Sequence, residues 1–222
     1  MDDQPHIQID VNGPYIVDGP VPLTEMAPVH TLNGEPVDWH VLRAIESEEW
    51  PAYLCRCGGS KNKPFCDSTH ESNGFDGTEA ADRRPFAERA VVDEGAHEQL
   101  LDDKPLCVRA GFCRTRTTSV WDLLALGGDP EAAGRLREMT WNCPSGRLVL
   151  RDLDGNDIEP ELAPEVGVVP GGPLWIRGGI RVTGSDGTEW ETRNRVALCR
   201  CGGSASKPFC DGAHLRRHFD ER

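Results

Sequence analysis

The chain of 222 residues has little with which to build a large apolar core. It contains only 2 Tyr and 6 Phe, and no apolar run approaches the length needed to cross a membrane. The first residues, MDDQPHIQID, lack the basic and apolar regions of a secretory signal peptide. We therefore expect a cytoplasmic protein with a modest core, in which bound cofactors help to hold the fold together.

Basic residues are also scarce. The 24 Lys and Arg are outnumbered by 37 Asp and Glu, which gives a formal net charge of −13. Such a surface repels the phosphates of nucleic acids, so we expect neither a nucleic-acid nor a membrane partner. It suits instead a partner protein with a basic face.

Signatures of common enzymes are missing as well. The glycine-rich segments fit neither G-x-G-x-x-G after a strand nor G-x4-G-K-[ST], the two loops typical of nucleotide-binding proteins. The chain has no Ser/His/Asp constellation with a supporting motif. We therefore do not expect an enzyme.

What the chain does contain is 9 Cys in three groups of three. In a reducing compartment, an odd number of cysteines grouped in this way indicates metal ligands rather than disulfides. The groups are Cys55, Cys57 and Cys66; Cys107, Cys113 and Cys143; and Cys199, Cys201 and Cys210.

The first and third groups lie in a repeated segment. CRCGGSKNKPFCDSTH (55–70, the first motif) and CRCGGSASKPFCDGAH (199–214, the second motif) are identical at 12 of 16 positions. Both read C-x-C-x8-C-x3-H, so that His70 and His214 complete two sets of three cysteines and one histidine. Spacing alone leaves a structural zinc site and an iron–sulfur site both open.

CRCGGSASKPFCDGAH resembles the CDGSH motif of the NEET-type iron–sulfur proteins, the family of mitoNEET. The C-x-C pair, the Ser, the Pro before the third Cys, the Asp after it and the His are all in register. The resemblance implies a [2Fe–2S] cluster in each copy, one iron held by the C-x-C pair and the other by the third cysteine and the histidine. The implied ligands are Cys55, Cys57, Cys66 and His70, and Cys199, Cys201, Cys210 and His214.

The first motif departs from the family pattern near its end. Ser68 stands where the second motif has Gly212, and we expect Ser68 to sit in the first turn of a helix without strain. Asp67 and Asp211 are predicted to cap this helix through the N–H three residues on.

The middle cysteines form a separate pattern. CVRAGFC (107–113) and NCPSGRL thirty residues later resemble the divergent single-cluster ferredoxin domains often found beside CDGSH motifs, with Arg109 where those domains have His. The resemblance implies a third cluster held by Cys107, Cys113 and Cys143, either [3Fe–4S] or [4Fe–4S] with one ligand other than Cys. The alternative is that these are buried thiols in a ferredoxin-like fold that has lost its cluster.

The repeat extends to the flanks of the motifs, because NGPYIVDGPVPL (12–23) matches the pattern of GGPLWIRGGIRV (171–182). We predict an α+β protein in which a ferredoxin-like α+β insert (79–165) separates two small antiparallel β CDGSH repeats (1–78 and 166–222). Residues 76–85 and 160–173 are the candidate linkers. Family members form intertwined homodimers or carry two motifs in one chain. This chain resembles the second type, which implies a pseudo-twofold pair of repeats and a monomer.

Within the insert, TSVWDLLAL (118–126) and the segment that begins at Asp129-Pro130 predict two helices. RLVLRDLDGNDIEPEL predicts a hairpin that turns at Asp154-Gly155.

The function that this arrangement favours is electron transfer. We expect an electron carrier whose electrons come from a partner redox protein with a basic face, such as a reductase or an oxygenase. A histidine ligand raises the reduction potential of a cluster, and it also titrates near neutral pH. A redox- or pH-sensing or cluster-transfer protein is therefore one alternative. A zinc-bearing interaction module is the other.

Overall fold

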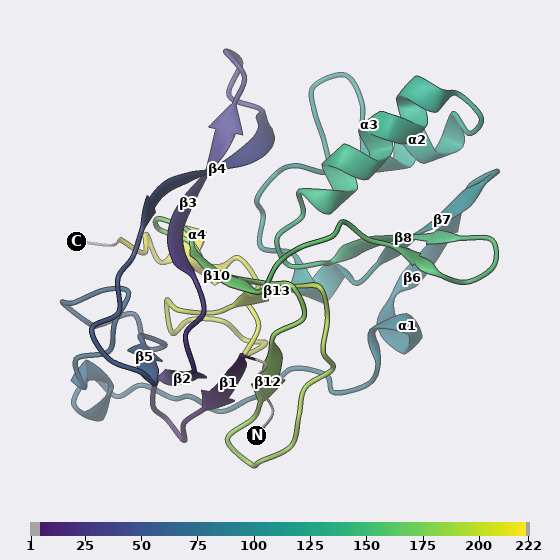
Figure 1. The fold of residues 1–222 in the computed structure, drawn as a ribbon. Coiled ribbons are helices and arrows are strands. Elements are labelled where there is room, and N and C mark those ends of the chain that lie inside the picture. The colour runs from purple at the N-terminus through teal and green to yellow at the C-terminus, as the bar shows by residue number, and fades with distance from the viewer. Residues whose placement is uncertain (1–4, 221–222) are drawn as a thin grey trace.

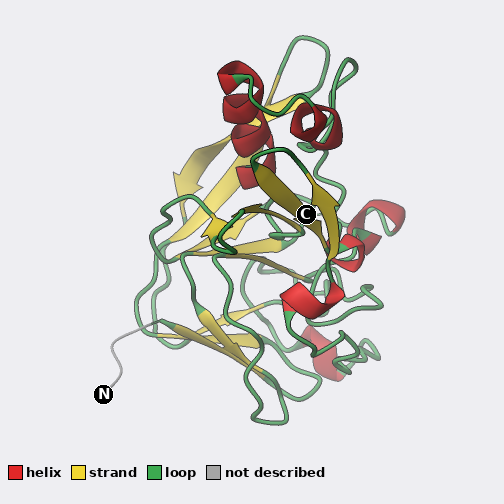
Figure 2. Cartoon of the chain, turned by 90° about the vertical axis from the view of Figure 1, so that its right-hand side faces the viewer, coloured by secondary structure: helices red, strands yellow, loops and turns green. Residues whose placement is uncertain are grey.

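The computed structural model describes residues 5–220, which form three small sheets and a few short helices (Figure 1). In two views at right angles, α2 (Val120–Ala125) and α3 (Pro130–Trp141) lie at one end of the molecule, and the sheet that contains β1 (His6–Ile9) lies at the other (Figures 1 and 2). The architecture is α+β, as predicted. No helix in the described part of the chain is both long and apolar enough to cross a membrane.

Two of the sheets are built from the repeats. The first has the order β12-β1-β2-β5, and the second has the order β13-β11-β10-β3-β4. Besides β1, the strands of the first sheet are β12 (Arg181–Thr183), β2 (Tyr15–Asp18) and β5 (Ala52–Leu54). Those of the second are β13 (Arg195–Leu198), β11 (Leu174–Arg177), β10 (Glu165–Val168), β3 (Leu23–His30) and β4 (Pro36–Ala44).

Each repeat contributes its third strand to the other repeat's sheet. β12 of the second repeat pairs in parallel with β1, and β3 of the first repeat pairs in parallel with β10. Pairings between strands of the same repeat are antiparallel. The prediction of purely antiparallel sheets is therefore wrong, because it treated each repeat as a unit that pairs only with itself. β10 also lies inside the predicted linker 160–173.

A single apolar core follows from this exchange of strands. In β1 the alternation of half-buried and buried side chains places Ile7 and Ile9 inside. They belong to one buried cluster with Val17 of the first repeat and with Leu174 and Leu198 of the second. Because this cluster takes buried side chains from both repeats, the two repeats stabilise each other.

The insert has its own sheet and core. The sheet order is β6-β7-β8-β9, and the helices cover it through a buried cluster that joins Leu100 and Leu150 to Leu123 and Leu136. Its strands are β6 (Val91–Glu94), β7 (Glu98–Asp102), β8 (Leu148–Asp152) and β9 (Asp157–Ile158). The remaining helical elements are α1 (Phe86–Arg89), α4 (Ala213–Arg216) and the 3₁₀ turns η1 (Thr69–Glu71) and η2 (Lys104–Leu106).

The predicted helices and hairpin of the insert are present. The Asp129 side chain accepts a hydrogen bond from the Glu131 N–H and caps α3, which begins at Pro130. β8 and β9 pair antiparallel around the turn that contains Gly155, whose φ of +91° suits glycine.

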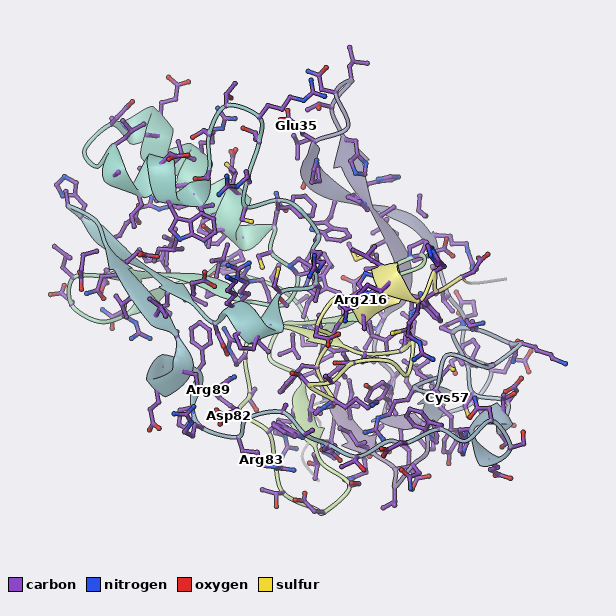
Figure 3. All side chains as sticks on the ribbon, turned by 180° about the vertical axis from the view of Figure 1, so that it is seen from behind. Glu35, Cys57, Asp82, Arg83, Arg89 and Arg216 are labelled. Carbon is purple, nitrogen blue, oxygen red and sulfur yellow. The ribbon has the colours of Figure 1, made fainter. Side chains whose placement is uncertain are left out.

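The hairpin of β3 and β4 projects from the first repeat and reaches the insert (Figure 1). Glu35 at its turn accepts a hydrogen bond of 2.5 Å from the Arg116 N–H, beside a loop of the insert (Figure 3). Further along β4, the rings of Trp39 and Phe112 lie 5.0 Å apart. In the second repeat a short turn closed by the Gly187 N–H and the Gly184 carbonyl follows β12. Thr183 pairs antiparallel with Glu189 across this turn, so the second repeat has a much shorter hairpin at the equivalent place.

Candidate metal centres

In both motifs the predicted ligands come together as pairs. A strand delivers the first cysteine, β5 to Cys55 and β13 to Cys199. The glycine after each C-x-C pair has positive φ, +78° at Gly58 and +71° at Gly202, which turns the chain so that both sulfurs face one point. The distances are 3.9 Å for Cys55 Sγ–Cys57 Sγ, 3.8 Å for Cys199 Sγ–Cys201 Sγ, 3.4 Å for Cys66 Sγ–His70 Nδ1 and 3.3 Å for Cys210 Sγ–His214 Nδ1.

These separations match those of two ligands on one tetrahedral ion. With metal–sulfur distances of about 2.3 Å and metal–nitrogen distances of about 2.0–2.1 Å, two sulfurs lie about 3.8 Å apart and a sulfur and a nitrogen about 3.6 Å apart. No group of three or more Cys, His, Asp or Glu side chains that could hold one ion occurs within residues 5–220. Each motif therefore presents two pairs of ligand atoms, and each pair fits one metal ion.

The aspartate after the third cysteine ties the two halves of each motif together. Asp67 accepts hydrogen bonds from the N–H groups of Lys61 and Thr69, at 2.8 and 3.1 Å. Asp211 does the same with Ala205 and Ala213, at 3.0 and 2.9 Å. The prediction was a bond from the N–H three residues after the aspartate, whereas the structure shows a bond from the N–H two residues after it. The reason is that the intervening residue adopts the left-handed conformation before the helix begins.

That left-handed residue differs between the motifs. It is Gly212 in the second motif, with φ of +80°, and Ser68 in the first, with φ of +64°. The prediction that Ser68 sits in a helical turn without strain is wrong, because a side chain in this region costs about 1–2 kcal/mol.

Backbone donors surround the sulfurs. The Gly59 N–H donates to Cys57 Sγ at 3.3 Å, and the N–H groups of Ser68 and Gly212 donate to Cys66 Sγ and Cys210 Sγ at 3.4 Å each. Such hydrogen bonds favour the thiolate over the thiol, and thiolates are the form that binds metals.

One thiol of each C-x-C pair is prepared to ionise. The pKa of Cys57 is lowered to about 5 and that of Cys199 to about 6, in each case chiefly because the sulfur accepts a hydrogen bond from the other thiol of the pair. Burial acts in the opposite direction and dominates at Cys210, whose pKa is raised. A bound cation would offset that cost, as is typical of buried metal sites.

The arginine inside each C-x-C pair was missed at the sequence level. Arg56 and Arg200 are only 2 % and 1 % exposed. Arg56 donates to the carbonyls of Asp10 and Gly77, and Arg200 donates to those of Gly172 and Val169. Arg200 interacts electrostatically with the sulfurs of Cys55 and Cys201, so this buried cation is complementary to an anionic cofactor bound there. From the sequence, an arginine between the two cysteines of a C-x-C pair is expected at the surface, and only the fold shows that it is buried.

The two motifs touch each other through their C-x-C turns. A Cβ atom on Gly58 would lie 2.7 Å from the Cys201 carbonyl oxygen, and one on Gly202 would lie 2.5 Å from that of Cys57. Only glycine permits such an approach in both directions. Tyr15 adds a one-sided link, because its buried hydroxyl donates to the Cys199 carbonyl at 2.7 Å and Leu174 occupies the equivalent position of the other repeat.

The motifs differ in exposure. Cys210 and His214 are buried, at 2 % and 7 % exposure, whereas Cys66 and His70 are half-buried. Figure 3 shows Cys57 in the part of the molecule formed by the first repeat, and α4, which carries His214, with the labelled Arg216.

The three middle cysteines converge on one recess. Cys107, Cys113 and Cys143 all line it, together with Arg147. Burial raises the pKa of Cys113, and the thiolates of Cys143 and Cys107 raise it further. Arg147 forms a two-pronged ion pair with Asp102 at 2.5 and 2.6 Å, which together with the nearby Cys107 raises its pKa. A permanently charged guanidinium therefore stands beside the thiols.

Two residues that sequence reasoning missed hold this recess in place. Arg195 of β13 donates to the Cys143 carbonyl at 2.8 Å and to the Thr140 carbonyl at 2.7 Å, and it pairs with Glu159. Trp39 donates from its indole nitrogen to the Asn142 carbonyl at 3.0 Å. Both come from the repeats, so the middle recess is supported by strands far away in the sequence.

Comparison with known families agrees with this arrangement. Residues 12–71 and 171–215 match the family model described as "Iron-binding zinc finger CDGSH type". Residues 94–153 match the model described as "Divergent 4Fe-4S mono-cluster". Comparisons with curated proteins and with solved structures gave no match.

The fold, the paired ligands and the family matches define an iron–sulfur-binding protein. Within that class, the chain carries two CDGSH-type segments, one on either side of a divergent 4Fe-4S mono-cluster domain.

Proposed function

We propose that the chain is an electron-transfer protein that holds two [2Fe–2S] clusters and a third cluster, [3Fe–4S] or [4Fe–4S], in the insert. The observation that carries this proposal is the pairing of ligands, because two pairs per motif suit a two-iron centre better than a single zinc ion. When bound, such clusters accept and release single electrons.

The residues of the chain prepare the sites for such cofactors. The C-x-C pair, the third cysteine and the histidine of each motif would be the ligands, and a neutral imidazole brings one negative charge fewer than a thiolate. Buried Arg56 and Arg200 add positive charge nearby. In the insert, Cys107, Cys113 and Cys143 would hold the third cluster beside Arg147.

The three sites form a row, which supports electron transfer among them. The C-x-C turns of the two motifs meet at Gly58 and Gly202. Val108 of the insert packs against Cys210 of the second motif. The second motif therefore contacts both the first motif and the loop that carries two of the middle cysteines.

The exposed end of the row supports a basic partner protein. Cys66 lines an open groove together with Glu46, Glu48 and Glu49. A partner with a basic face would be steered to this groove and would meet a ligand of the first motif there.

A pair of small-molecule oxidants tests this docking face. Hexaammineruthenium(III), a cation, should oxidise the reduced protein at a rate that falls as the salt concentration rises. The double variant Glu48→Gln/Glu49→Gln should be oxidised more slowly than the parent at low salt. Ferricyanide, an anion, should show the opposite salt dependence. If the oxidation rate depends on salt equally in the parent protein and in the double variant, the groove is not the docking face.

We also propose that the two repeats are related by a pseudo-twofold axis and that the protein is a monomer. The exchanged strands β3 and β12 and the reciprocal approach of Gly58 and Gly202 support this arrangement. Static light scattering that shows an obligate dimer would contradict it.

The visible spectrum and metal content test the cofactors. We expect reddish-brown protein with more iron than two [2Fe–2S] clusters require when it is prepared without oxygen. An oxidised [3Fe–4S] centre is paramagnetic, so its resonance signal should disappear in Cys143→Ser while the colour of the two CDGSH sites remains. Colourless protein with stoichiometric zinc would instead support an interaction module, and only four irons per chain would leave the insert as a spacer.

One specific observation favours a second function for the first motif. Cys57, Cys66 and His70 are all half-buried, so their site is open to other molecules. A site of this kind suits the transfer of a cluster to an acceptor protein, or the sensing of oxidants or pH, alongside electron transfer.

A further inference from the structure

The loop that carries the first two middle cysteines (residues 107–113, the middle loop) lies directly on the second motif. Val108 is 4 % exposed and forms a buried cluster with Ala197 and Cys210, against which Ala110 also packs. A segment of the insert thus contacts a predicted ligand of the second CDGSH site.

Arg109 extends this contact. Its backbone has φ of +62°, a region that L-residues seldom adopt. A Cβ atom on Gly212 would lie 3.1 Å from the Cγ and Cδ atoms of Arg109 and 3.3 Å from its Nε. The stem of the arginine therefore lies flat on the glycine, and its charged end is left at the surface.

The covered glycine stands between two predicted ligands. Its N–H donates to Cys210 Sγ at 3.4 Å, and α4 with His214 begins one residue later. The side chain of Arg109 thus covers the short piece of backbone that joins Cys210 to His214.

The first motif has an exposed serine at the position of the covered glycine. Ser68 is exposed, and Cys66 and His70 on either side of it are half-buried. The difference in exposure between the two motifs thus coincides with the presence of the middle loop and of Arg109 on only one of them.

We propose that Arg109 is a positioning residue that holds the middle loop over the second CDGSH site, so that this site retains its cluster while the first site exchanges with solvent and partners. The proposal rests on the proposed function, because it assigns different roles to the two sites.

The rate of cluster loss to an iron chelator tests the proposal. In the parent protein the two CDGSH clusters should be lost in two separate phases of the visible absorbance, distinct from the loss of the third cluster, and His70→Cys should change the faster of these two phases. Arg109→Ala, which keeps the backbone strain but removes the stem, should accelerate the slow phase about fivefold or more, the ratio that corresponds to about 1 kcal/mol. Arg109→Lys keeps an apolar stem and should restore a slow phase close to that of the parent.

Two further variants complete the comparison. Arg135→Ala removes the same charge from an exposed position on α3 and should leave both phases unchanged. Arg109→Asn serves if Arg109→Ala does not fold, because asparagine tolerates positive φ and its side chain is too short to cover Gly212. If neither short side chain accelerates the slow phase, Arg109 does not cover the site.

Hydrogen exchange separates failure of this inference from failure of the proposed function. In protein as isolated, the amides of residues 210–215 should exchange more slowly than those of residues 66–71, and Arg109→Ala should accelerate exchange only in the first of these segments. This readout does not depend on electron transfer or on the metal bound. Equal protection of the two segments in the parent would overturn the inference, even if the protein proved to be an active electron carrier.

Discussion

The sequences of the first and second motifs differ at only four of sixteen positions, yet the fold gives them different surroundings. The second is enclosed by the insert, by Tyr15 of the other repeat and by Phe219, which packs against Cys199 and Cys201. The first faces solvent and an acidic groove. The two motifs thus carry the same four predicted ligands, and what differs between them is how easily solvent reaches those side chains.

The largest expected effect comes from the arginine that joins the second motif to the insert. Arg195 is buried and bound to Glu159 and to several carbonyls, and Pro51 is its equivalent in the first repeat. Arg195→Ala would leave Glu159 and the carbonyls without their partner, so we expect a loss of about 3–5 kcal/mol in the free energy of unfolding. Denaturant unfolding measures it.

The control for that experiment is Arg135→Ala on the exposed face of α3, where the change should stay within about 0.5 kcal/mol. A loss at Arg195 no larger than this would mean that the insert and the second motif are not coupled through this side chain.

Converting the second motif toward the first should be costly. Gly212→Ser places a side chain at φ of +80° and within 3.1 Å of Arg109. Strain of about 1–2 kcal/mol and overpacking of about 1–3 kcal/mol add up to an expected destabilisation of about 2–5 kcal/mol. Thermal unfolding measures this loss of stability. The double variant Gly212→Ser/Arg109→Ala should recover the part of the loss that comes from overpacking, but not the part that comes from backbone strain. No recovery would show that Arg109 does not lie on the glycine.

Removing the hydroxyl of Tyr15 should weaken the second motif selectively. Tyr15→Phe leaves the Cys199 carbonyl, which accepts a 2.7 Å hydrogen bond, without this donor in a buried place. We expect a loss of about 1–3 kcal/mol, together with faster release of iron from the second site. Chelator kinetics provide the measurement. Faster release from the first site alone would contradict the one-sided link.

Converting the first motif toward the second should be favourable. Ser68→Gly relieves the strain of φ of +64° at an exposed position, while glycine adds freedom to the unfolded chain. The net gain should be about 1 kcal/mol or less, measured as a small rise in the melting temperature. A clear loss of stability would show that Ser68 makes a contact that offsets its strain.

The smallest expected effect is a shift in acid tolerance. Burial lowers the pKa of His214, so its imidazole stays neutral to a lower pH than usual. Since a ligand must be neutral, the stability that this site contributes is present above the ordinary value of about 6.5 and is lost as pH falls through the lowered pKa. In His70→Cys, where only this site keeps its histidine, colour should fade with a midpoint below about 6.5. A midpoint at or above that value would contradict the burial argument.

Local patterns predicted the elements that depend on neighbouring residues. The two helices of the insert, the cap at Asp129 and the turn at Gly155 follow from propensity and turn chemistry. The C-x-C and C-x3-H spacings likewise predicted which side chains would meet, and the structure places each pair within 3.9 Å or less, while their role as ligands stays a prediction.

Features that depend on distant residues could not be predicted in this way. The parallel pairing of β1 with β12 joins opposite ends of the chain, and a repeat in the sequence does not reveal whether its strands are exchanged. Arg195 and Arg109 look like ordinary surface residues until the fold places them against other segments. The conformation of Ser68 was missed because serine gives no signal for positive φ, whereas its equivalent Gly212 does.

The exchange of strands also sets an order of events during synthesis. Ile7 finds its partner Val182, and Leu23 finds Val166, only when the last third of the chain has left the ribosome. The sheet of the insert, by contrast, is made from strands that follow each other between residues 91 and 158. Since domains fold as units during synthesis, the insert can fold while the N-terminal strands are still unpaired. The two CDGSH sites would then form together, next to an insert that has already folded.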